Sequence, residues 1–333
     1  MITVTLYSRK DCHLCEQAEV DLETLQAKIP HRLVEMDIDA DPALLSAYLL
    51  EIPVVEVGPY KLKAPFTRQE LQKTLGAAND RQAQLERIDD KAYRAAVRRG
   101  ETITGSDRTS YWFSKNYLAI VNLILLLYVG LPFLAPVLKK VGANTAAEII
   151  YKVYSPVCHQ WAFRSYFLFG EQSYYPHVAA NIPGVLTFEA VTGISDQSDP
   201  TRLQARLFEG NPLLGFKVAL CERDVAIWGS LLLFGLIYAI TGRRLRSLPW
   251  WAWIIIGIIP MGLDGFSQTI SQFSLPVLQT ILPYRESTPF LRTLTGFLFG
   301  FSTAWFGFPV IEEAMADTRR LLAKKFASVV AKG

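Results

Sequence analysis

The feature that most constrains this chain is a run of 22 residues without a single charged side chain, Tyr117–Leu138. A helix of about 20 such residues is long enough to cross the hydrocarbon layer of a membrane. Two more charge-free runs follow at Val225–Thr241 and Thr293–Ile311. The segment Pro249–Leu263 begins with closely spaced tryptophans, which gather at membrane interfaces. We therefore predict four membrane-spanning helices in the second part of the chain.

A further apolar segment, residues 149–169, carries a lysine, a histidine and an arginine. It is either a fifth span or a helix that lies partly in the membrane. Basic residues favour the cytoplasmic side, and they gather at residues 242–246 and 318–325. With both ends of the chain inside, the number of crossings is even. We favour four spans, with the segment around Cys158 facing outward; if that segment spans, the same residues face the cytoplasm.

Residues 1–115 differ from the membrane part because charged residues occur throughout. The net charge of the whole chain is only +3, and no basic segment with interleaved aromatic residues occurs. We therefore expect no nucleic-acid binding. The first residues have no apolar core of signal-peptide length, so we expect this part in the cytoplasm. Four cysteines are too few for a secreted disulfide scaffold.

The strand and helix patterns of residues 1–78 predict a small three-layer α/β domain. The expected order is strand (2–7), helix (12–27), strand (32–39), helix (41–50), two antiparallel strands (52–58 and 60–64) and helix (67–75). In the first helix, a spacing of three to four residues predicts one buried face made of Leu14, Ala18, Leu22 and Leu25. The last helix begins with the capping-box pattern of a threonine followed three residues later by a glutamate.

Cys12 and Cys15 form a Cys-x-x-Cys at the start of the first helix. The unpaired N–H groups and the helix dipole at such a position stabilise a thiolate, and Arg9 and Lys10 precede it. Cys12 is therefore the expected nucleophile, and Cys15, one turn later, is the expected resolving thiol. Pro53 stands before the third strand, where a cis-proline can lie against the dithiol.

Through "CHLC" and "IPVVEV", residues 1–77 resemble the glutaredoxin/thioredoxin superfamily, and most of all its short glutaredoxin-like proteins. The resemblance implies a thioredoxin-like fold and a redox-active disulfide. The region "GPYKLKAPFTRQEL" lacks the paired glycines that help glutaredoxins to hold glutathione, so the use of glutathione stays open. The alternative is a zinc site made of Cys12, His13 and Cys15, for which His31 is the one other candidate ligand in this part.

Four stretches of the membrane part place thiol or ionisable groups at the ends of apolar runs: "VCHQWAFRSYFLFG", "LCERDVAIWG", "GLDGFSQ" and "YRESTPFLRTLTG". Such groups are costly in lipid and usually face a protein interior or a water-filled cavity. Helical spacing puts Asp264 and Gln268 on one face, and Cys221, Asp224 and Trp228 on another. We expect the carboxylates to offset the arginines, namely Asp224, Asp264 and Glu286 against Arg164, Arg223, Arg285 and Arg292.

These stretches resemble an uncharacterised family of bacterial and archaeal integral membrane proteins. The resemblance covers about residues 115–315 and implies an architecture and a site, but no particular reaction. The residues that carry it are Cys158, His159, Gln160, Arg164, Ser165, Cys221, Arg223, Asp224, Asp264, Gly265, Gln268, Glu286, Ser287, Arg292, Thr295 and Gly296.

Three interpretations of this cluster stay open. In the structural one, buried ion pairs hold a helix bundle, and Cys158 and Cys221 are small buried residues. In the redox one, these two cysteines form a dithiol that exchanges with a carrier. In the metal one, Cys158, His159 and Cys221, with Asp264 or Glu286, bind copper or zinc. Adjacent residues on a helix point about 100° apart, which makes Cys-His a weak ligand spacing.

The predicted fold class is an α/β thioredoxin-like N-terminal domain plus an all-α polytopic membrane domain of four to five transmembrane helices. We expect the domain at 1–78, a charged linker at 79–114, the membrane domain at 115–315 with an inserted loop at 171–214, and a basic tail at 316–333.

A Cys-x-x-Cys domain tethered to its own membrane domain has a high effective concentration for thiols there. We therefore predict a membrane-anchored thiol-disulfide oxidoreductase. If Cys158 and Cys221 face outward, the domain cannot touch them directly, and a carrier such as a quinone has to move electrons across the membrane. The alternative is a metal-binding or small-solute membrane protein whose first domain senses or loads. Expected partners are membrane lipid and another thiol protein or glutathione, and the cofactors considered are a quinone, copper and zinc.

Overall fold

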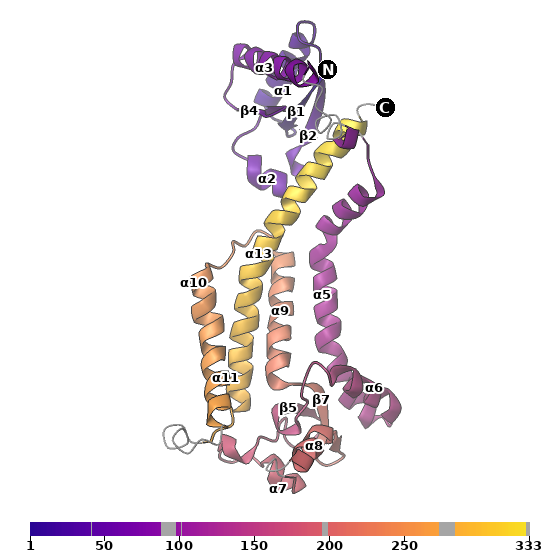
Figure 1. Cartoon of the computed structure of the whole chain (residues 1–333), viewed down its shortest axis with the longest axis vertical. Helices are drawn as coiled ribbons and strands as arrows, with labels where there is room; N and C mark the ends of the chain where they lie inside the picture. Colours follow the sequence, from indigo (N-terminus) through magenta and orange to yellow (C-terminus); the bar gives the residue numbers. More distant parts are fainter. Residues whose placement is uncertain (41, 88–97, 101, 195–198, 273–283, 331–333) are drawn as a thin grey trace. The chain divides into compact units, whose positions relative to one another are not determined.

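The computed structural model of the chain describes residues 1–40, 42–87, 98–100, 102–194, 199–272 and 284–330. The chain divides into two compact units (Figure 1). The first contains Met1–Tyr117 and Glu313–Gly333, and the second contains Leu118–Glu312. The redox motif lies in the first unit, and the polar stretches of the membrane part lie in the second.

The N-terminal part of the first unit is a four-stranded sheet with helices. Its elements are β1 (Ile2–Ser8), α1 (His13–Gln26), β2 (His31–Asp37), η1 (Ile38–Ala40), α2 (Pro42–Tyr48), β3 (Val54–Val57), β4 (Tyr60–Lys63) and α3 (Arg68–Arg87). The strand order is β2-β1-β3-β4; β1 and β2 are parallel, whereas β3 pairs antiparallel with both β1 and β4. The predicted thioredoxin-like arrangement is confirmed.

The buried face of α1 differs by one residue from the predicted one. Cys15, Ala18, Leu22 and Leu25 are buried, whereas Leu14 is 57% exposed, so its place in the predicted stripe was wrong. Both sets repeat every three to four residues, and the sequence spacing alone does not say where the stripe begins. Ala18, Leu22 and Leu25 pack on β1, β3 and α3 in one apolar core.

The capping box at the start of α3 is confirmed. The backbone N–H of Thr67 donates to Glu70 Oε2 at 2.7 Å, and the N–H of Glu70 donates to Thr67 Oγ1 at 3.3 Å. Thr104 and Asp107 make the same reciprocal pair at the start of α5 (Gly105–Lys140). Each pair satisfies two N–H groups that a helix leaves without an internal partner.

Four helices among the described residues are long and apolar enough to cross a membrane, as predicted. They are α5, α9 (Glu222–Ile240), the continuous run of α10 (Trp250–Trp253), η4 (Ile254–Ile258) and α11 (Ile259–Ser271), and α13 (Pro289–Val330). The middle turn of the third span, η4, is π-helical.

Residues 149–169 do not form a fifth span. Helix α6 (Asn144–Tyr154) has 11 residues and is therefore about 16 Å long, too short to cross. It ends in a turn that contains Cys158, followed by η2 (Ala162–Arg164) and β5 (Ser165–Leu168).

The expected inserted loop is largely folded where it is described. It contains η3 (Val178–Ala180), α7 (Phe188–Thr192), α8 (Asp199–Leu207) and β6 (Gly210–Asn211). Strand β7 (Gly215–Cys221) pairs antiparallel with β5 and β6, and Phe163, Phe167, Tyr175 and Phe188 bury a core beside this sheet. The sheet is an addition to the all-helical expectation. β5 and β6 are too short to leave an alternating pattern, and β7 is buried along most of its length and therefore does not alternate between apolar and polar residues.

Within the second unit, the small sheet lies at the end of the bundle where α5 ends, α9 begins and α11 ends (Figure 1). Helices α9 and α13 approach closely because Gly296 and Gly300 have no side chain. A Cβ at Gly296 would lie 2.8 Å from the carbonyl oxygen of Arg223, closer than normal packing allows. The polar stretches of the membrane part lie at this end of the bundle.

Candidate functional site

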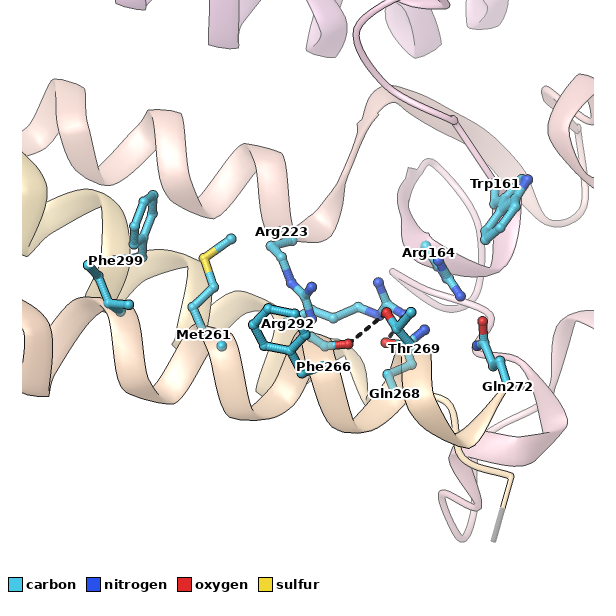
Figure 2. Close-up of a pocket in the computed structure, with 13 residues that line it drawn as sticks. Trp161, Arg164, Arg223, Met261, Phe266, Gln268, Thr269, Gln272, Arg292 and Phe299 are labelled. Atoms are coloured by element: carbon cyan, nitrogen blue, oxygen red, sulfur yellow. Dashed lines mark hydrogen bonds between the residues drawn. The ribbon is translucent and has the colours of Figure 1, made fainter. Parts of the chain in front are cut away.

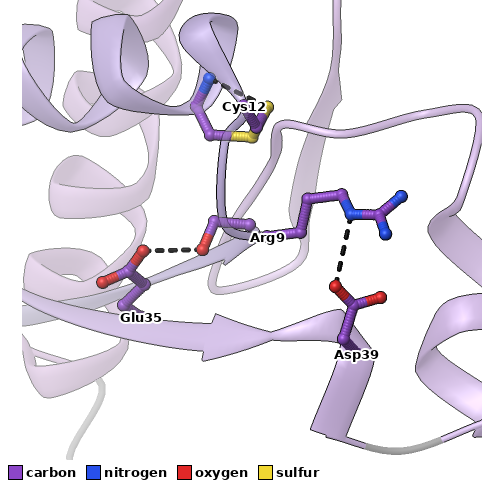
Figure 3. The surroundings of a disulfide bond; sticks show 6 residues. Arg9, Cys12, Glu35 and Asp39 are labelled. Atoms are coloured by element: carbon purple, nitrogen blue, oxygen red, sulfur yellow. Dashed lines mark hydrogen bonds and ion pairs between the residues drawn. A yellow bond between two sulfur atoms is a disulfide. The ribbon is translucent and has the colours of Figure 1, made fainter.

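The first site is the dithiol of the N-terminal unit. Cys12 is the N-cap of α1 and forms a disulfide with Cys15 (Figure 3). Cys12 Sγ also accepts a hydrogen bond from the backbone N–H of Cys15 at 3.2 Å. Cys15 is buried and Cys12 is half-buried. The residue at the helix start is thus the more accessible cysteine of the pair.

Two carboxylates near this disulfide, those of Asp39 and Glu35, have polar partners. Arg9 Nε lies 3.3 Å from Asp39 Oδ2, and Ser8 Oγ donates to Glu35 Oε1 at 2.6 Å (Figure 3). Arg9, which we expected to stabilise the thiolate, is therefore engaged with Asp39 in this oxidised form. The Ile52–Pro53 peptide bond is cis. The antiparallel register pairs Tyr7 with Val54, which places Pro53 beside the end of β1 that leads to the dithiol.

The second site brings together two cysteines that lie 63 residues apart in the sequence. Cys158 is buried in the turn after α6, and Cys221 ends β7 and is the N-cap of α9. Cys158 Sγ accepts a hydrogen bond from the backbone N–H of Cys221 at 3.3 Å. The two sulfurs and a carboxylate oxygen of Asp224 all lie within 4.8 Å of one another. A disulfide needs about 2.0 Å between sulfurs, so joining the two thiols requires a closer approach and an oxidant that takes up two electrons.

The two thiols differ in acidity. A hydrogen bond from the Cys221 thiol lowers the pKa of Cys158, and the backbone N–H of Gln160 adds to this effect. Donating that bond, together with burial, raises the pKa of Cys221 well above its usual value. Of the two, Cys158 is therefore the more acidic thiol.

A buried lysine holds the Cys158 turn against β7. Lys217 Nζ donates to the carbonyl oxygens of Gln160 at 2.8 Å and Arg206 at 2.5 Å. The Gln160 side chain donates to the carbonyl oxygen of Tyr151 at 2.9 Å, and the Tyr151 hydroxyl donates to that of Lys217 at 2.6 Å. Burial lowers the pKa of Lys217 to about 7, and a neutral amine still has two protons for its two carbonyls. Gln160 therefore holds the turn through its side chain and its carbonyl oxygen.

His159 is placed differently from the residues on either side of it. It is exposed, and its ring lies 5.4 Å from that of Trp161, centroid to centroid. Among the described residues, the group that the sulfurs form contains Asp224 in place of His159. Asp264 and Glu286, the other ligands considered, are engaged with arginines.

Glu286 is the centre of one buried ionic cluster. Its carboxylate accepts from Arg164 Nε at 2.5 Å and from Arg164 Nη2 at 2.7 Å, and it is ion-paired with Arg292. Gln268 Nε2 donates to the same carboxylate at 2.8 Å, and Gln268 Oε1 accepts from Arg292 at 3.0 Å. This cluster joins η2, α11 and the start of α13.

Asp264 is the centre of a second cluster. Its oxygens lie 2.5 Å from Arg223 Nη2 and 2.8 Å from Arg285 Nη2, and the Ser287 hydroxyl donates to it at 2.7 Å. The predicted offset of arginines by Asp264 and Glu286 is therefore confirmed. Asp224, the third carboxylate in that prediction, lies with the two thiols instead.

Glu222 is a site residue that the sequence reasoning missed. It is 1% exposed, and neither carboxylate oxygen has a hydrogen-bond partner among the described residues. Lys217 was also missed, as was Gln272, which donates to Glu286 at 3.2 Å. The position of Glu222 next to Cys221, at the start of an apolar run, is the one signal that marked it.

The two parts of the chain match two different families. Residues 3–76 match the family described as Glutaredoxin-like domain (DUF836), and residues 212–306 match the family described as Predicted membrane protein (DUF2085). The Uncharacterized protein MJ1492 of Methanocaldococcus jannaschii is 26% identical over 206 residues, which is 60% of this chain and 94% of that protein. The chain thus carries a glutaredoxin-like domain at its N-terminal end and a DUF2085 predicted membrane protein domain in its second half, which supports a membrane-associated redox-type protein.

Proposed function

We propose that the chain is a membrane-anchored thiol-disulfide oxidoreductase. The observation that carries the proposal is the Cys12–Cys15 disulfide, with the half-buried Cys12 sulfur at the N-terminus of α1 in a glutaredoxin-like domain. The neighbouring thiols of Cys158 and Cys221 supply a second pair in the membrane domain.

The reaction of the N-terminal pair balances as a two-electron exchange. The Cys12 thiolate attacks one sulfur of a substrate disulfide, a mixed disulfide forms, and the other substrate sulfur leaves as a thiolate. The Cys15 thiolate then attacks Cys12 Sγ and releases the second substrate thiol. The substrate gains two electrons, and the Cys12–Cys15 disulfide remains. A dithiol protein or two glutathione molecules would return it to the reduced form.

We propose that the glutaredoxin-like domain faces the cytoplasm of a bacterial or archaeal cell. The connection between α9 and α10 carries Arg243, Arg244 and Arg246, and the end of α13 carries further basic residues. Basic segments of this kind favour the cytoplasmic side. Because α5 is the candidate span between the dithiol and Cys158 among the described residues, the two pairs then lie on opposite sides. Cys158 and Cys221 therefore exchange with a separate thiol partner or a membrane carrier.

The test uses a full chain with Cys158→Ser and Cys221→Ser, so that Cys12 and Cys15 are the remaining cysteines of the four. After reduction and removal of the reductant, the protein is mixed with a peptide that contains one disulfide. We expect one peptide disulfide to be reduced per chain. Adding Cys15→Ser should instead trap the peptide on Cys12, which intact-mass analysis detects.

Adding Cys12→Ser is the matched control and should abolish both the reduction and the trapped adduct. Peptide reduction that survives Cys12→Ser, or a Cys15→Ser chain that forms no adduct at Cys12, would contradict the assigned roles.

Metal binding is a second candidate function, favoured by the grouping of Cys158, Cys221 and Asp224 within 4.8 Å. Two thiolates and a carboxylate suit zinc, and thiolates also suit Cu(I). Elemental analysis of the purified chain distinguishes the candidates. One zinc or copper ion per chain that is lost with Cys158→Ala and kept with His159→Ala would favour this function over the dithiol.

A further inference from the structure

A cavity of about 470 Å³ adjoins the two ionic clusters of the membrane domain (Figure 2). Arg164, Arg223 and Arg292 line it, together with side chains of α11 and Phe299 of α13. All of these residues belong to the second unit. The thiol pair does not line the cavity among the described residues, and the redox proposal does not use it.

The lining of the cavity changes from apolar to polar along the third span. Ile258 and Met261 line it near the middle of the span, whereas Gln268 and Gln272 line it at the end. In Figure 2, Met261 and Phe299 lie at one end of the cavity and Gln272 and Arg164 at the other. Ile258 and Gln272 are 14 residues apart, which is about 21 Å along a helix. The cavity is therefore polar at the membrane boundary and apolar toward the membrane interior.

The polar end of the cavity has more positively charged than negatively charged side chains. Four arginines share the two carboxylates of Asp264 and Glu286, and three of the four line the cavity. Counting the neighbouring Glu222 still leaves one excess positive charge in this network. Arg223 Nε is also buried without a hydrogen-bond partner among the described residues. Buried charge of this kind is costly unless an anion offsets it.

We propose that this cavity binds one anionic phospholipid. The phosphate would lie against the guanidinium groups of Arg164, Arg223 and Arg292. Each guanidinium carries five N–H donors, more than its carboxylate partner accepts, and Arg223 Nε has no partner among the described residues. One acyl chain would run along α11 past Met261 to Phe299. Charge complementarity selects an anionic head, and the apolar end at depth selects a lipid over a soluble phosphate.

Two variants test the two ends of the cavity separately. Arg223→Gln removes a cavity arginine and leaves Asp264 with Arg285 and Ser287 as partners. Gly262→Leu fills the apolar part without changing charge. A Cβ at Gly262 would meet only the Phe266 ring, at 3.8 Å, so the new side chain displaces no backbone.

The matched controls change the same residue types elsewhere in the second unit. Arg243→Gln removes an arginine that does not line the cavity. Gly229→Leu adds a leucine to α9 at a position with no atom within 4 Å of the new Cβ. Arg243→Gln shows whether losing any positive charge weakens lipid binding, and Gly229→Leu shows whether adding a leucine to a membrane helix does so.

The measurement is native mass spectrometry of the full chain, purified in a neutral detergent and titrated with phosphatidylglycerol, phosphatidylcholine or glycerol phosphate. We expect one phosphatidylglycerol per chain, bound at least tenfold more tightly than phosphatidylcholine. Arg223→Gln and Gly262→Leu should each weaken it at least tenfold, whereas both controls should bind like the unchanged chain.

Equal affinity for the two phospholipids would overturn the proposal, because no anionic head would then be recognised. Glycerol phosphate binding as tightly as phosphatidylglycerol would show an anion site without a lipid chain. A neutral quinone that displaces phosphatidylglycerol from the cavity would assign it to a different occupant. Unchanged lipid binding in Gly262→Leu would show that the acyl chain does not occupy the apolar end of the cavity, which would overturn the proposed binding mode.

Discussion

Replacing Glu286 by glutamine tests whether its ionic cluster holds the polar end of the bundle together. The Glu286 side chain is 2% exposed, and its partners Arg292 and Arg164 are 5% and 18% exposed. Glutamine keeps the shape but leaves two buried guanidinium groups without their carboxylate. Removing one partner of a buried ion pair costs about 3–5 kcal/mol. For a domain of this size, 1 kcal/mol lowers the melting temperature by about 2–4 °C, so we expect a fall of about 6–20 °C.

Thermal unfolding of the chain in detergent, followed by tryptophan fluorescence, measures this effect. The control is Glu148→Gln, because that side chain is 47% exposed and lies 3.9 Å from Lys139. An exposed pair contributes about 0–1 kcal/mol, so the control should melt within about 4 °C of the unchanged chain. Adding Arg164→Gln to Glu286→Gln removes one of the two guanidinium groups that have lost their carboxylate. The double variant should therefore recover part of the lost melting temperature. A Glu286→Gln chain that melts like the control would refute the reasoning.

Three further changes have expected outcomes. The pKa of Lys217 is about 7 in the folded chain, against a usual value of 10.5. Between these two pH values Lys217 is therefore protonated in the unfolded chain and neutral in the folded chain. Raising the pH from about 7 to 10 should therefore stabilise the unchanged chain relative to Lys217→Met, by at most about 1.4 kcal/mol per pH unit in unfolding titrations. Gly300→Ala should lower the melting temperature of the bundle because its methyl group would collide with an α9 carbonyl, whereas Gly307→Ala, with no atom within 4 Å, should not. Thr67→Ala removes the capping hydrogen bond of α3 and should cost about 1 kcal/mol in chemical unfolding of the N-terminal domain.

The spans and the glutaredoxin-like domain were predictable because their signals are local. A charge-free run of span length reports a membrane helix by itself, and the strand and helix patterns of the first 77 residues follow one another without long interruptions. The offset of Leu14 shows the limit of periodicity: a spacing of three to four residues fixes the repeat and leaves the starting residue undetermined. The approach of Cys158 to Cys221 was hypothesised from their common setting at the ends of apolar runs.

The remaining features depend on contacts between distant segments. Nothing local to residues 171–214 indicates that they fold back to supply β6 to a sheet with β5 and β7. The metal interpretation grouped His159 with Cys158, but the positive φ of 53° at Gln160 belongs to a turn that leaves His159 exposed. Asp224 and Asp264 were both expected to offset arginines, although helical spacing placed Asp224 on the same face as Cys221. In the fold, Asp224 lies with the two thiols and Asp264 with two arginines.

The central claim is that Cys158 and Cys221 form a redox-active pair in the membrane domain. Its most direct test is a redox titration of the full Cys12→Ser chain in membranes. Free thiols are alkylated at each potential, and mass spectrometry then quantifies the peptide that links Cys158 to Cys221. The account predicts a reversible disulfide between these two residues that forms and disappears in a single two-electron transition. If both thiols remain alkylated separately at every potential, the membrane domain holds no redox pair, and the claim is contradicted.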